Sequence, residues 1–300
     1  MAGLGTTVTA HSEEGPLVSA DPAPPRPQRA AANDLQPGRL ILTLYGLYAR
    51  SDRNWIAVSS LVRLMADLGI EEPAVRSSVS RLTRRGTLRS LRVDGAAGYA
   101  LSPSSIVLLR EGDVRIFGRR RARLEDGWVL VVFSVPEAQR AKRHELRKWL
   151  TRLGFGTAAS GVWVAPGTLT DETREVLARR GLDTYVDIFR ADRVAYGGAA
   201  EKVSEWWDLP ELSAQYEGFI RRYASLAEYD AKQPPTDSEA FAQYVPAVTT
   251  WRRLPYLDPG LPLALLPRPW NGITAGELFT ELNDRLAQPA QRHAQTVMEA

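Results

Sequence analysis

The hydrophobic periodicity of residues 37–101 restricts the fold of this 300-residue chain more than any other feature. Three successive segments repeat apolar residues at helical spacing, and the segment after them reads as two strands. The helical stripes consist of Leu40, Ile41, Leu44, Tyr45 and Tyr48, then Leu61, Leu64, Met65 and Leu68, then Val75, Val79 and Leu82. Three helices followed by a two-stranded hairpin predict a winged helix-turn-helix.

Glycine and proline mark the ends of these elements. Gly69 supplies a left-handed end to the second helix, Pro73 suits the first turn of the third helix, and Gly86 ends that helix. The strands are predicted at Thr87–Val93 and Tyr99–Leu101. Asp94-Gly95 is a hairpin turn signal, but residues 96–98 predict a loop of more than two residues.

A fourth helix is predicted after the hairpin. Ser102 is a suitable N-cap and Pro103 a suitable first-turn residue, so the helix should begin there and continue towards Phe117. The arginine run 119–121 follows it. We expect these arginines to contact DNA phosphates.

The third helix leaves a polar face outside its apolar stripe. A helix fits the major groove of DNA, where arginine can form two hydrogen bonds with guanine and serine can contact bases or phosphates. The hairpin adds arginines that would lie near the DNA backbone or the minor groove. The candidate DNA-binding residues are therefore Arg76, Ser77, Ser80, Arg81, Arg84 and Arg85 on the helix, with Arg89 and Arg92 on the hairpin.

The charge distribution supports this interpretation. Residues 76–123 contain twelve arginines and three acidic residues, a formal charge of +9, whereas the rest of the chain carries −6. A concentrated positive charge suits a polyanion such as double-stranded DNA. The alternative is a small helical domain with arginine on its solvated side, because arginine is the preferred cation throughout this chain. Charge, turn and hairpin together favour DNA binding.

The rest of the chain divides into three further parts. Residues 1–36 are rich in proline and lack apolar periodicity, so we expect a disordered tail before the DNA-binding domain at 37–123. Residues 124–190 predict a ferredoxin-like βαββαβ domain, and residues 191–300 a helical C-terminal domain. An α+β fold class follows. The central elements are expected at Trp128–Val135, a helix through Leu146–Leu153, strands near Phe155 and at Val162–Ala165, a helix capped by Thr170, and a strand at Thr184–Phe189.

The C-terminal domain shows two aromatic stripes and an irregular proline-rich segment. A last helix is expected near Gly276–Leu286. Trp206, Trp207, Trp251 and Trp270 are more often core residues than ligand contacts at such spacing, although a pocket could use some of them.

Composition excludes several classes of chemistry. The chain has no cysteine, which excludes disulfides, thiol catalysis and cysteine-based metal sites. Three separated histidines, His11, His144 and His293, do not predict a metal centre. The sequence lacks a Walker motif and a nucleophile elbow. We expect no metal, no cofactor, no catalytic residues and no membrane contact, and a cytoplasmic location.

Seven collinear segments carry a resemblance to a known family. They are LILTLYGLY (40–48), AVRSSVSRLTRRG (74–86), YALSP (99–103), GWVLVVFSVPE (127–137), LGFGTAASGVWVAP (153–166), WDLPELSAQYEGF (207–219) and RRLPYLDPGLPLALLP (252–267). The resemblance that they carry extends roughly from Pro37 to Leu286, nearly the whole ordered chain. In this set and order they resemble the phenylacetic acid degradation repressor family, PaaX.

The resemblance implies a homodimeric transcription regulator, usually a repressor, that binds operator DNA. In the type member, an aryl-acetyl-CoA thioester lifts the repression. The DNA-binding role transfers to the 74–86 segment, hence to the arginines and serines named above. The effector, an acyl-CoA thioester such as phenylacetyl-CoA or a related small molecule, cannot be placed on particular residues. Repression and activation remain open, since they depend on where the operator lies.

The central block is also similar to the ferredoxin-like subunit of the CRISPR spacer-acquisition nuclease. That resemblance implies an aspartate at the end of the first strand, where it would hold a metal. Here Ser134 stands at about that place, and a hydroxyl is a poor ligand for a hard divalent cation. Asp183 and Asp187 are expected at the surface. A non-catalytic scaffold or a platform for dimerisation is therefore favoured over the alternative, a metal-dependent nucleic-acid processing enzyme.

Overall fold

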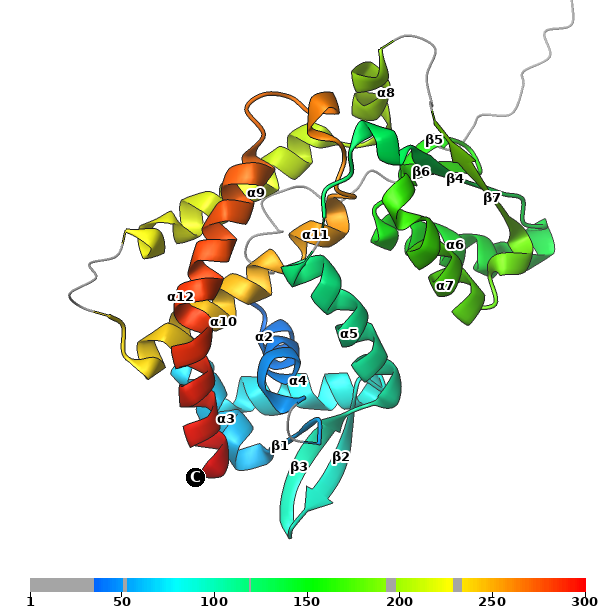
Figure 1. Ribbon diagram of the computed structural model, residues 1–300. Helices are drawn as coiled ribbons and strands as arrows, with labels where there is room; N and C mark the ends of the chain where they lie inside the picture. The colour runs from blue at the N-terminus through cyan, green and yellow to red at the C-terminus, as the bar shows by residue number, and fades with distance from the viewer. Residues whose placement is uncertain (1–34, 51–52, 119, 193–197, 229–233) are drawn as a thin grey trace, which may run out of the picture.

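The structure is a computed structural model that describes residues 35–50, 53–118, 120–192, 198–228 and 234–300. Helices are combined with two antiparallel sheets, so the predicted α+β class is confirmed. One sheet has three strands, in the order β1 (Trp55–Ala57), β3 (Ala96–Leu101) and β2 (Leu88–Val93) (Figure 1). The other has four, in the order β5 (Gly156–Ala159), β6 (Val162–Pro166), β4 (Trp128–Phe133) and β7 (Val186–Ala191). The predicted tail at 1–36 falls almost entirely outside the described residues.

The first unit contains the three helices expected from the periodicity. The first begins as α2 (Pro37–Leu44) and continues as a π-helical turn, η1 (Tyr45–Ala49). It is followed by α3 (Val58–Asp67) and α4 (Glu72–Arg84). Gly69 and Gly86 both have positive φ, at 75° and 67°, as residues that end helices in the left-handed conformation do. The buried side of α4 consists of Val75, Ser78, Val79 and Leu82.

The hairpin differs from the prediction at its turn. Strand β2 (Leu88–Val93) pairs with β3 (Ala96–Leu101), and Val93 lies opposite Ala96. The loop is therefore the two residues Asp94-Gly95, both at positive φ, and residues 96–98 belong to the strand. The expectation of a longer loop was wrong because the alanines and glycine there were interpreted as loop residues, whereas backbone pairing decides the register.

A third strand of this sheet was not expected. Strand β1 (Trp55–Ala57) pairs with β3, and its three residues are too few to show alternation. The indole of Trp55 packs over Gly98, where an added Cβ would lie 2.4 Å from the ring. The glycine that suggested a loop is thus needed for a close side-chain approach within the sheet.

Helix α5 (Pro103–Phe117) leads from the hairpin to the central unit. Ser102 caps it, because its Oγ accepts a hydrogen bond from the Ser105 N–H at 3.3 Å. Near its other end the buried Arg115 donates through Nε to Glu172 at 2.8 Å. This ion pair fastens α5 to the central unit.

The central unit places two helices on one side of the four-stranded sheet (Figure 1). Its elements are β4 (Trp128–Phe133), α6 (Arg140–Leu153), β5 (Gly156–Ala159), β6 (Val162–Pro166), α7 (Thr170–Arg179) and β7 (Val186–Ala191). It has its own hydrophobic core, to which α6 contributes the buried side chains of Leu146, Trp149, Leu150 and Leu153. Thr170 is not the cap that was expected. It is the first residue of α7, and its hydroxyl donates to the Gly167 carbonyl.

The C-terminal helices join the first unit in one continuous core. They are α8 (Ala199–Trp206), α9 (Leu209–Ala227), α10 (Asp237–Trp251), α11 (Leu254–Leu257) and α12 (Asn271–Glu299). Helix α12 is much longer than the expected 276–286 and ends beside α3 (Figure 1). There His293 Nε2 lies 2.8 Å from Asp67 Oδ2. In the described part of the chain, no helix is both long and apolar enough to cross a bilayer.

Candidate nucleic-acid interface

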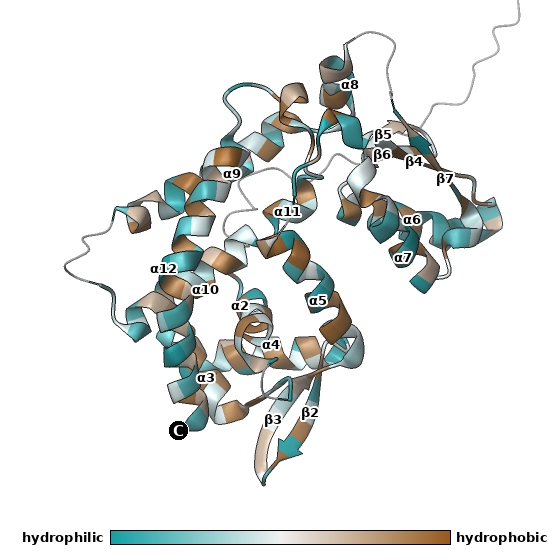
Figure 2. Ribbon diagram, viewed as in Figure 1, coloured by the Kyte–Doolittle hydropathy of each residue, from teal (hydrophilic) through white to brown (hydrophobic). Residues whose placement is uncertain are grey.

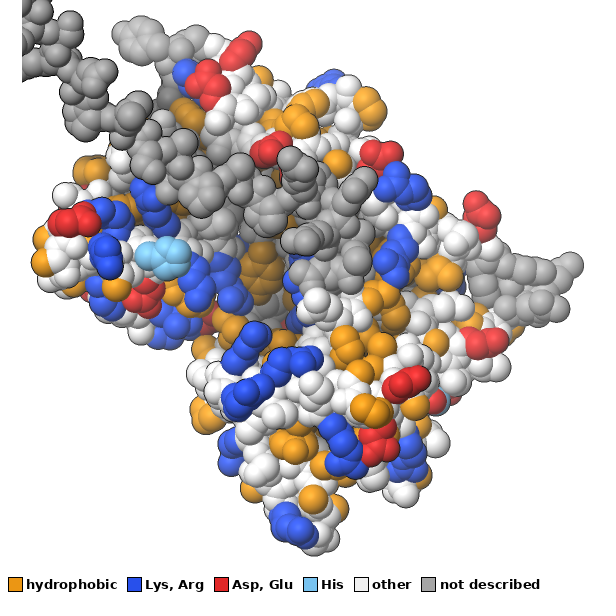
Figure 3. Space-filling model, turned by 180° about the vertical axis from the view of Figure 1, so that it is seen from behind, with side chains coloured by type: hydrophobic (Ala, Val, Ile, Leu, Met, Phe, Trp, Pro, Cys, Tyr) orange, Lys and Arg blue, Asp and Glu red, His pale blue; other side chains and the backbone are white. Residues whose placement is uncertain are grey.

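Helix α4 presents a polar face opposite its buried side. In Figure 2, apolar and polar residues alternate along α4 in brown and teal, as in an amphipathic helix. The six side chains predicted to contact DNA are all exposed, as are the two on β2: Arg76, Ser77, Ser80, Arg81, Arg84, Arg85, Arg89 and Arg92. Figure 3 shows blue Lys and Arg side chains over the lower part of the molecule, where the first unit lies.

The contacts on α4 separate these arginines into two kinds. Arg76 donates through Nε to Glu72 at 2.6 Å, so its charge is neutralised on the helix surface. Arg81 donates to the hydroxyls of Ser77 and Ser78, each at 2.8 Å. Serine hydroxyls leave the guanidinium charge intact. In the described part of the chain, no acidic side chain pairs with Arg81, Arg84 or Arg85.

The arginines of the hairpin lie on exposed positions of β2. Arg92 donates through Nη1 to the Gly95 carbonyl at 3.1 Å, which holds it beside the turn. Arg89 is one residue from the buried Leu88 and points into solvent. Because β2 follows α4 after a short turn, the exposed arginines of the helix and of the hairpin belong to the same structural unit.

The described arginines of the run after α5 are both paired with carboxylates of this chain. Arg119 lies outside the described residues. Arg120 donates to both carboxylate oxygens of Asp126, at 2.6 and 2.8 Å. Arg121 donates to the buried Asp258. The expectation of a phosphate contact is wrong for Arg121, because its guanidinium is paired with Asp258 and joins the segment after α5 to the loop after α11.

The Asp126 carboxylate accepts hydrogen bonds from two residues of this segment. The backbone N–H of Arg123 and the guanidinium of Arg120 together lower the pKa of Asp126 below its ordinary value. Because 63% of the Arg120 side chain is exposed, this ion pair lies at the surface, and it would have to break for Arg120 to contact a phosphate.

A second basic surface lies on α6 of the central unit. Its exposed cationic side chains are Arg140, Arg147 and Lys148, and its sequence contains one acidic residue, Glu145. The richness of this helix in lysine and arginine is visible in the sequence. It was not predicted as a DNA contact, because it lies outside the helix and hairpin that define the motif.

The candidate metal position at the end of β4 is occupied by Ser134, one residue beyond the strand and exposed. Asp183 and Asp187 are both exposed, as expected. Among the described residues, no group of three histidine or acidic side chains is arranged to hold a metal ion.

Comparison with known proteins identifies the family. Three family models match successive parts of the chain: PaaX-like protein at residues 36–105, PaaX protein central Cas2-like domain at 121–203, and PaaX-like protein C-terminal domain at 207–296. The chain therefore belongs to the PaaX family.

Two individual proteins resemble the chain over most of its length. The transcriptional repressor PaaX of Escherichia coli (strain K12) is 30% identical over 258 residues, which cover 84% of this chain and 80% of that protein. The structure of the uncharacterised protein Rv0674 from Mycobacterium tuberculosis has a TM-score of 0.55 at 22% identity. The match covers 85% of this chain and 97% of that one, and it shows a shared fold.

Proposed function

We propose that this protein is a sequence-specific DNA-binding transcriptional repressor, whose first unit acts as a winged helix-turn-helix. The observation that carries the proposal is the exposed face of α4. There, no acidic side chain of the described residues pairs with Arg81, Arg84 or Arg85, and the arginines of the hairpin follow in the same unit. The E. coli relative, named as a transcriptional repressor, supports this function. A cationic helix face of this kind fits the major groove, with the β2–β3 hairpin alongside the DNA backbone.

Selection of bound sites from a random pool of DNA duplexes tests the proposal. One enriched motif is expected, bound more tightly than unrelated duplexes at the same salt concentration. A variant with Arg81, Arg84 and Arg85 all replaced by alanine should enrich no motif. The matched control is Arg174→Ala on α7, an exposed arginine of the central unit, which should enrich the parent's motif. Equal enrichment by the triple variant would contradict the proposal.

We further propose that the central unit is a ferredoxin-like platform through which two copies form a homodimer. The strand order β5-β6-β4-β7 supports this, because it leaves β7 at an edge that a second sheet can pair with. Phe189 on β7 is 53% exposed, a large apolar side chain on that edge. Two copies would set two α4 helices against half-sites about 34–36 Å apart, or a multiple of that distance.

Light scattering coupled to size-exclusion chromatography measures the oligomeric state of the protein in solution. A dimer is expected for the parent chain and a monomer for Phe189→Asp. Leu263→Asp, which changes a 42% exposed leucine of the C-terminal region, is the control and should remain dimeric. A Phe189→Asp variant with the parent's mass would dismiss this edge as the interface.

The expected effector of the repressor is an acyl-CoA thioester such as phenylacetyl-CoA, or a related small molecule. This part of the proposal rests on the family resemblance. Release of the selected duplex by phenylacetyl-CoA at micromolar concentration, with free CoA as the control, would support it. The alternative of a metal-dependent nucleic-acid processing enzyme has no specific observation in its favour. Cleavage of labelled DNA or RNA with magnesium or manganese, abolished by chelator, would overturn the repressor proposal.

A further inference from the structure

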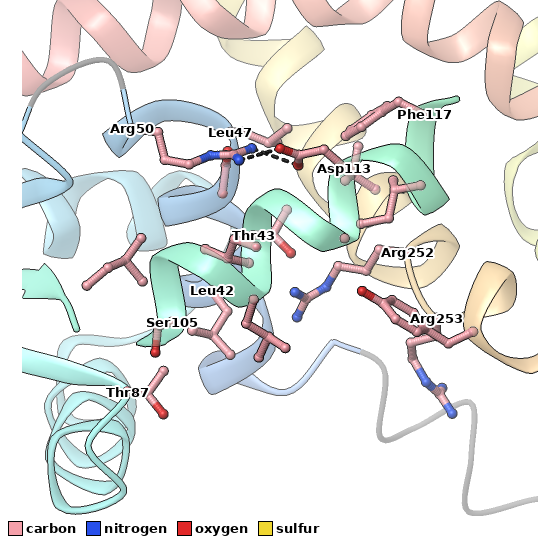
Figure 4. A pocket seen from close by; sticks show the side chains of 18 of the residues that line it. Leu42, Thr43, Leu47, Arg50, Thr87, Ser105, Asp113, Phe117, Arg252 and Arg253 are labelled. Atoms are coloured by element: carbon pink, nitrogen blue, oxygen red, sulfur yellow. Dashed lines mark hydrogen bonds and ion pairs between the residues drawn. The ribbon is translucent and has the colours of Figure 1, made fainter. Parts of the chain in front are cut away.

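A cavity of about 470 Å³ lies where the first unit, α5 and the C-terminal helices meet. Figure 4 shows side chains from these elements converging on it. Its volume falls within the range of small-molecule sites, which bury most of a ligand between apolar side chains. The apolar lining comes from α2 and η1, from α5, and from α10 and α11: Leu42, Leu47, Leu108, Leu109, Val248 and Leu257.

One cation in the wall of this cavity lacks the partner that buried charges normally have. Arg252, the C-cap residue of α10, donates through Nη2 to the Arg39 carbonyl at 3.2 Å. Its Nε is buried and has no hydrogen-bond partner. In the described part of the chain, no carboxylate pairs with it. The side chain as a whole is half-buried, but desolvation and a missing hydrogen bond both act against the guanidinium at its buried Nε.

The other charged groups around the cavity do not supply the missing anion. Asp113 of α5 faces the same space, but both its oxygens accept from the guanidinium of Arg50. Arg152 of α6 lies over the ring of Tyr256 at 5.4 Å, and Arg253 adds a further cation to the lining. Burial, and then the charge of Arg39, lower the pKa of Arg252 to about 10, so it remains a cation at neutral pH.

We propose that this cavity binds a small organic acid, whose apolar body lies between α5 and the α2–η1 segment and whose anionic group pairs with Arg252. The anion would accept a hydrogen bond from the unused Nε–H and neutralise the charge of Arg252. Hydrogen bonds between a charged donor and an anion are the strong ones, and a buried site strengthens them further. The apolar side chains of the lining would pack against the rest of the ligand.

The position of the cavity indicates how such a ligand would act. Its wall includes Thr87, which joins α4 to β2, and Leu101, the last residue of β3. The Thr87 carbonyl accepts from the Ser102 N–H at 3.0 Å, so the base of the hairpin and the start of α5 are linked. A ligand that separates α5 from α2 would thereby move the hairpin relative to α4. This regulatory part rests on the proposed function, and it requires different ligand affinities for the two arrangements.

Fluorescence titration of the full chain without DNA tests the site itself. The probe is 8-anilinonaphthalene-1-sulfonate, an aromatic anion, and its neutral counterpart is N-phenyl-1-naphthylamine. The parent should bind one molecule of either. Arg252→Gln should weaken binding of the anion by about tenfold or more and leave the neutral probe unaffected, because it removes one charged hydrogen bond. Arg221→Gln, at an exposed site on α9, is the control and should change neither.

A second variant fills the cavity. Gly46 lines it, and a Cβ there would have Leu109 Cδ2 at 3.9 Å as its nearest neighbour. Gly46→Leu should therefore fold, as circular dichroism would show, and lose both probes. Equal affinity of the anion for the parent, Arg252→Gln and Gly46→Leu would overturn the proposal.

The two proposals fail separately. If the anionic probe binds as expected and no DNA motif is enriched, the cavity assignment stands and the repressor function does not. If the motif is enriched and the probe does not bind, the reverse holds. When both succeed, adding the probe to the protein–DNA complex should change the affinity for the duplex in the parent and not in Gly46→Leu.

Discussion

Arg121 donates through Nη2 to the Asp258 Oδ2 at 2.8 Å, across 137 positions of sequence. Asp258 is buried, and it also accepts from the Tyr216 hydroxyl and from the Gly260 N–H. The segment that leaves α5 is thereby fixed to the loop between α11 and α12. One arginine of the basic run is thus a structural residue. The net charge of a segment therefore overstates the number of its cationic side chains that are available to contact DNA.

Arg121→Ala should lower the free energy of unfolding by about 2–3 kcal/mol. The reason is that Asp258 would remain buried with one of its charged partners removed, while the partial exposure of Arg121 reduces the loss. Urea denaturation measures the change. Arg120→Ala is the control, because the 63% exposed Arg120 pairs with Asp126 at the surface and should change stability little. A phosphate-binding role for Arg121 would instead leave stability unchanged and reduce the salt dependence of DNA binding.

Arg81→Ala should weaken binding to the selected site by about 1–3 kcal/mol and relax the preference at one base pair. In the free protein the guanidinium rests on Ser77 and Ser78, and DNA binding would exchange those hydroxyls for a base edge. Binding measured against every single-base variant of the site provides the test. Arg174→Ala serves again as control. Unchanged affinity and preference would remove Arg81 from the base-reading set.

The hairpin arginines should behave differently. Loss of Arg89 or Arg92, each an exposed cation on β2, should weaken binding to all duplexes alike. Each phosphate contact that is lost should reduce the slope of log affinity against log salt concentration by about one. The slope is measured between low and physiological salt for each alanine variant. A slope equal to the parent's, or a changed base preference, would contradict a backbone contact.

Stability should fall in acid partly through the pair that joins the start of α10 to the end of α12. Arg292 donates to both oxygens of Asp237, at 2.7 and 2.9 Å, and lowers the pKa of Asp237 below the ordinary 3.8. The contribution of a carboxylate with a lowered pKa is fully present above the unfolded value and is lost as the pH falls through the folded value. Urea midpoints between about pH 6 and pH 3 should therefore decrease less steeply for Asp237→Asn than for the parent. A slope for Asp237→Asn equal to the parent's would contradict this contribution of the Asp237–Arg292 pair.

The parts of the fold that local patterns determine were predictable. The stripes of α2, α3 and α4 are buried almost as the spacing requires, since amphipathic helices bury their apolar face wherever they pack. The extent of α12 was not predictable, because Pro289 lies inside it. Proline normally ends a helix, but Leu286, Ala290 and Ala294 are buried on either side of it, and this packing outweighs the lost hydrogen bond.

The location of the candidate site was predictable from the sequence, but which of its arginines are paired with acidic side chains was not. The sequence places arginines outside the apolar stripe of α4, but it does not show that Arg76 is paired with Glu72 while Arg84 is not. The cavity beside α5 was beyond sequence reasoning altogether. Its walls come from segments far apart in the chain. That the Nε of Arg252 is buried without a hydrogen-bond partner is apparent only from the folded structure.

The most direct test of the central claim uses the absence of cysteine from the sequence. Ser80→Cys places a single thiol on the exposed face of α4, to which an iron–EDTA cleavage reagent can be attached. Ser160→Cys places the same reagent on the exposed turn between β5 and β6. With the selected duplex, the reagent at position 80 should cut within the enriched motif, and the reagent at position 160 should not. Cutting within the motif from position 160 and none from position 80 would show that α4 does not lie against the DNA.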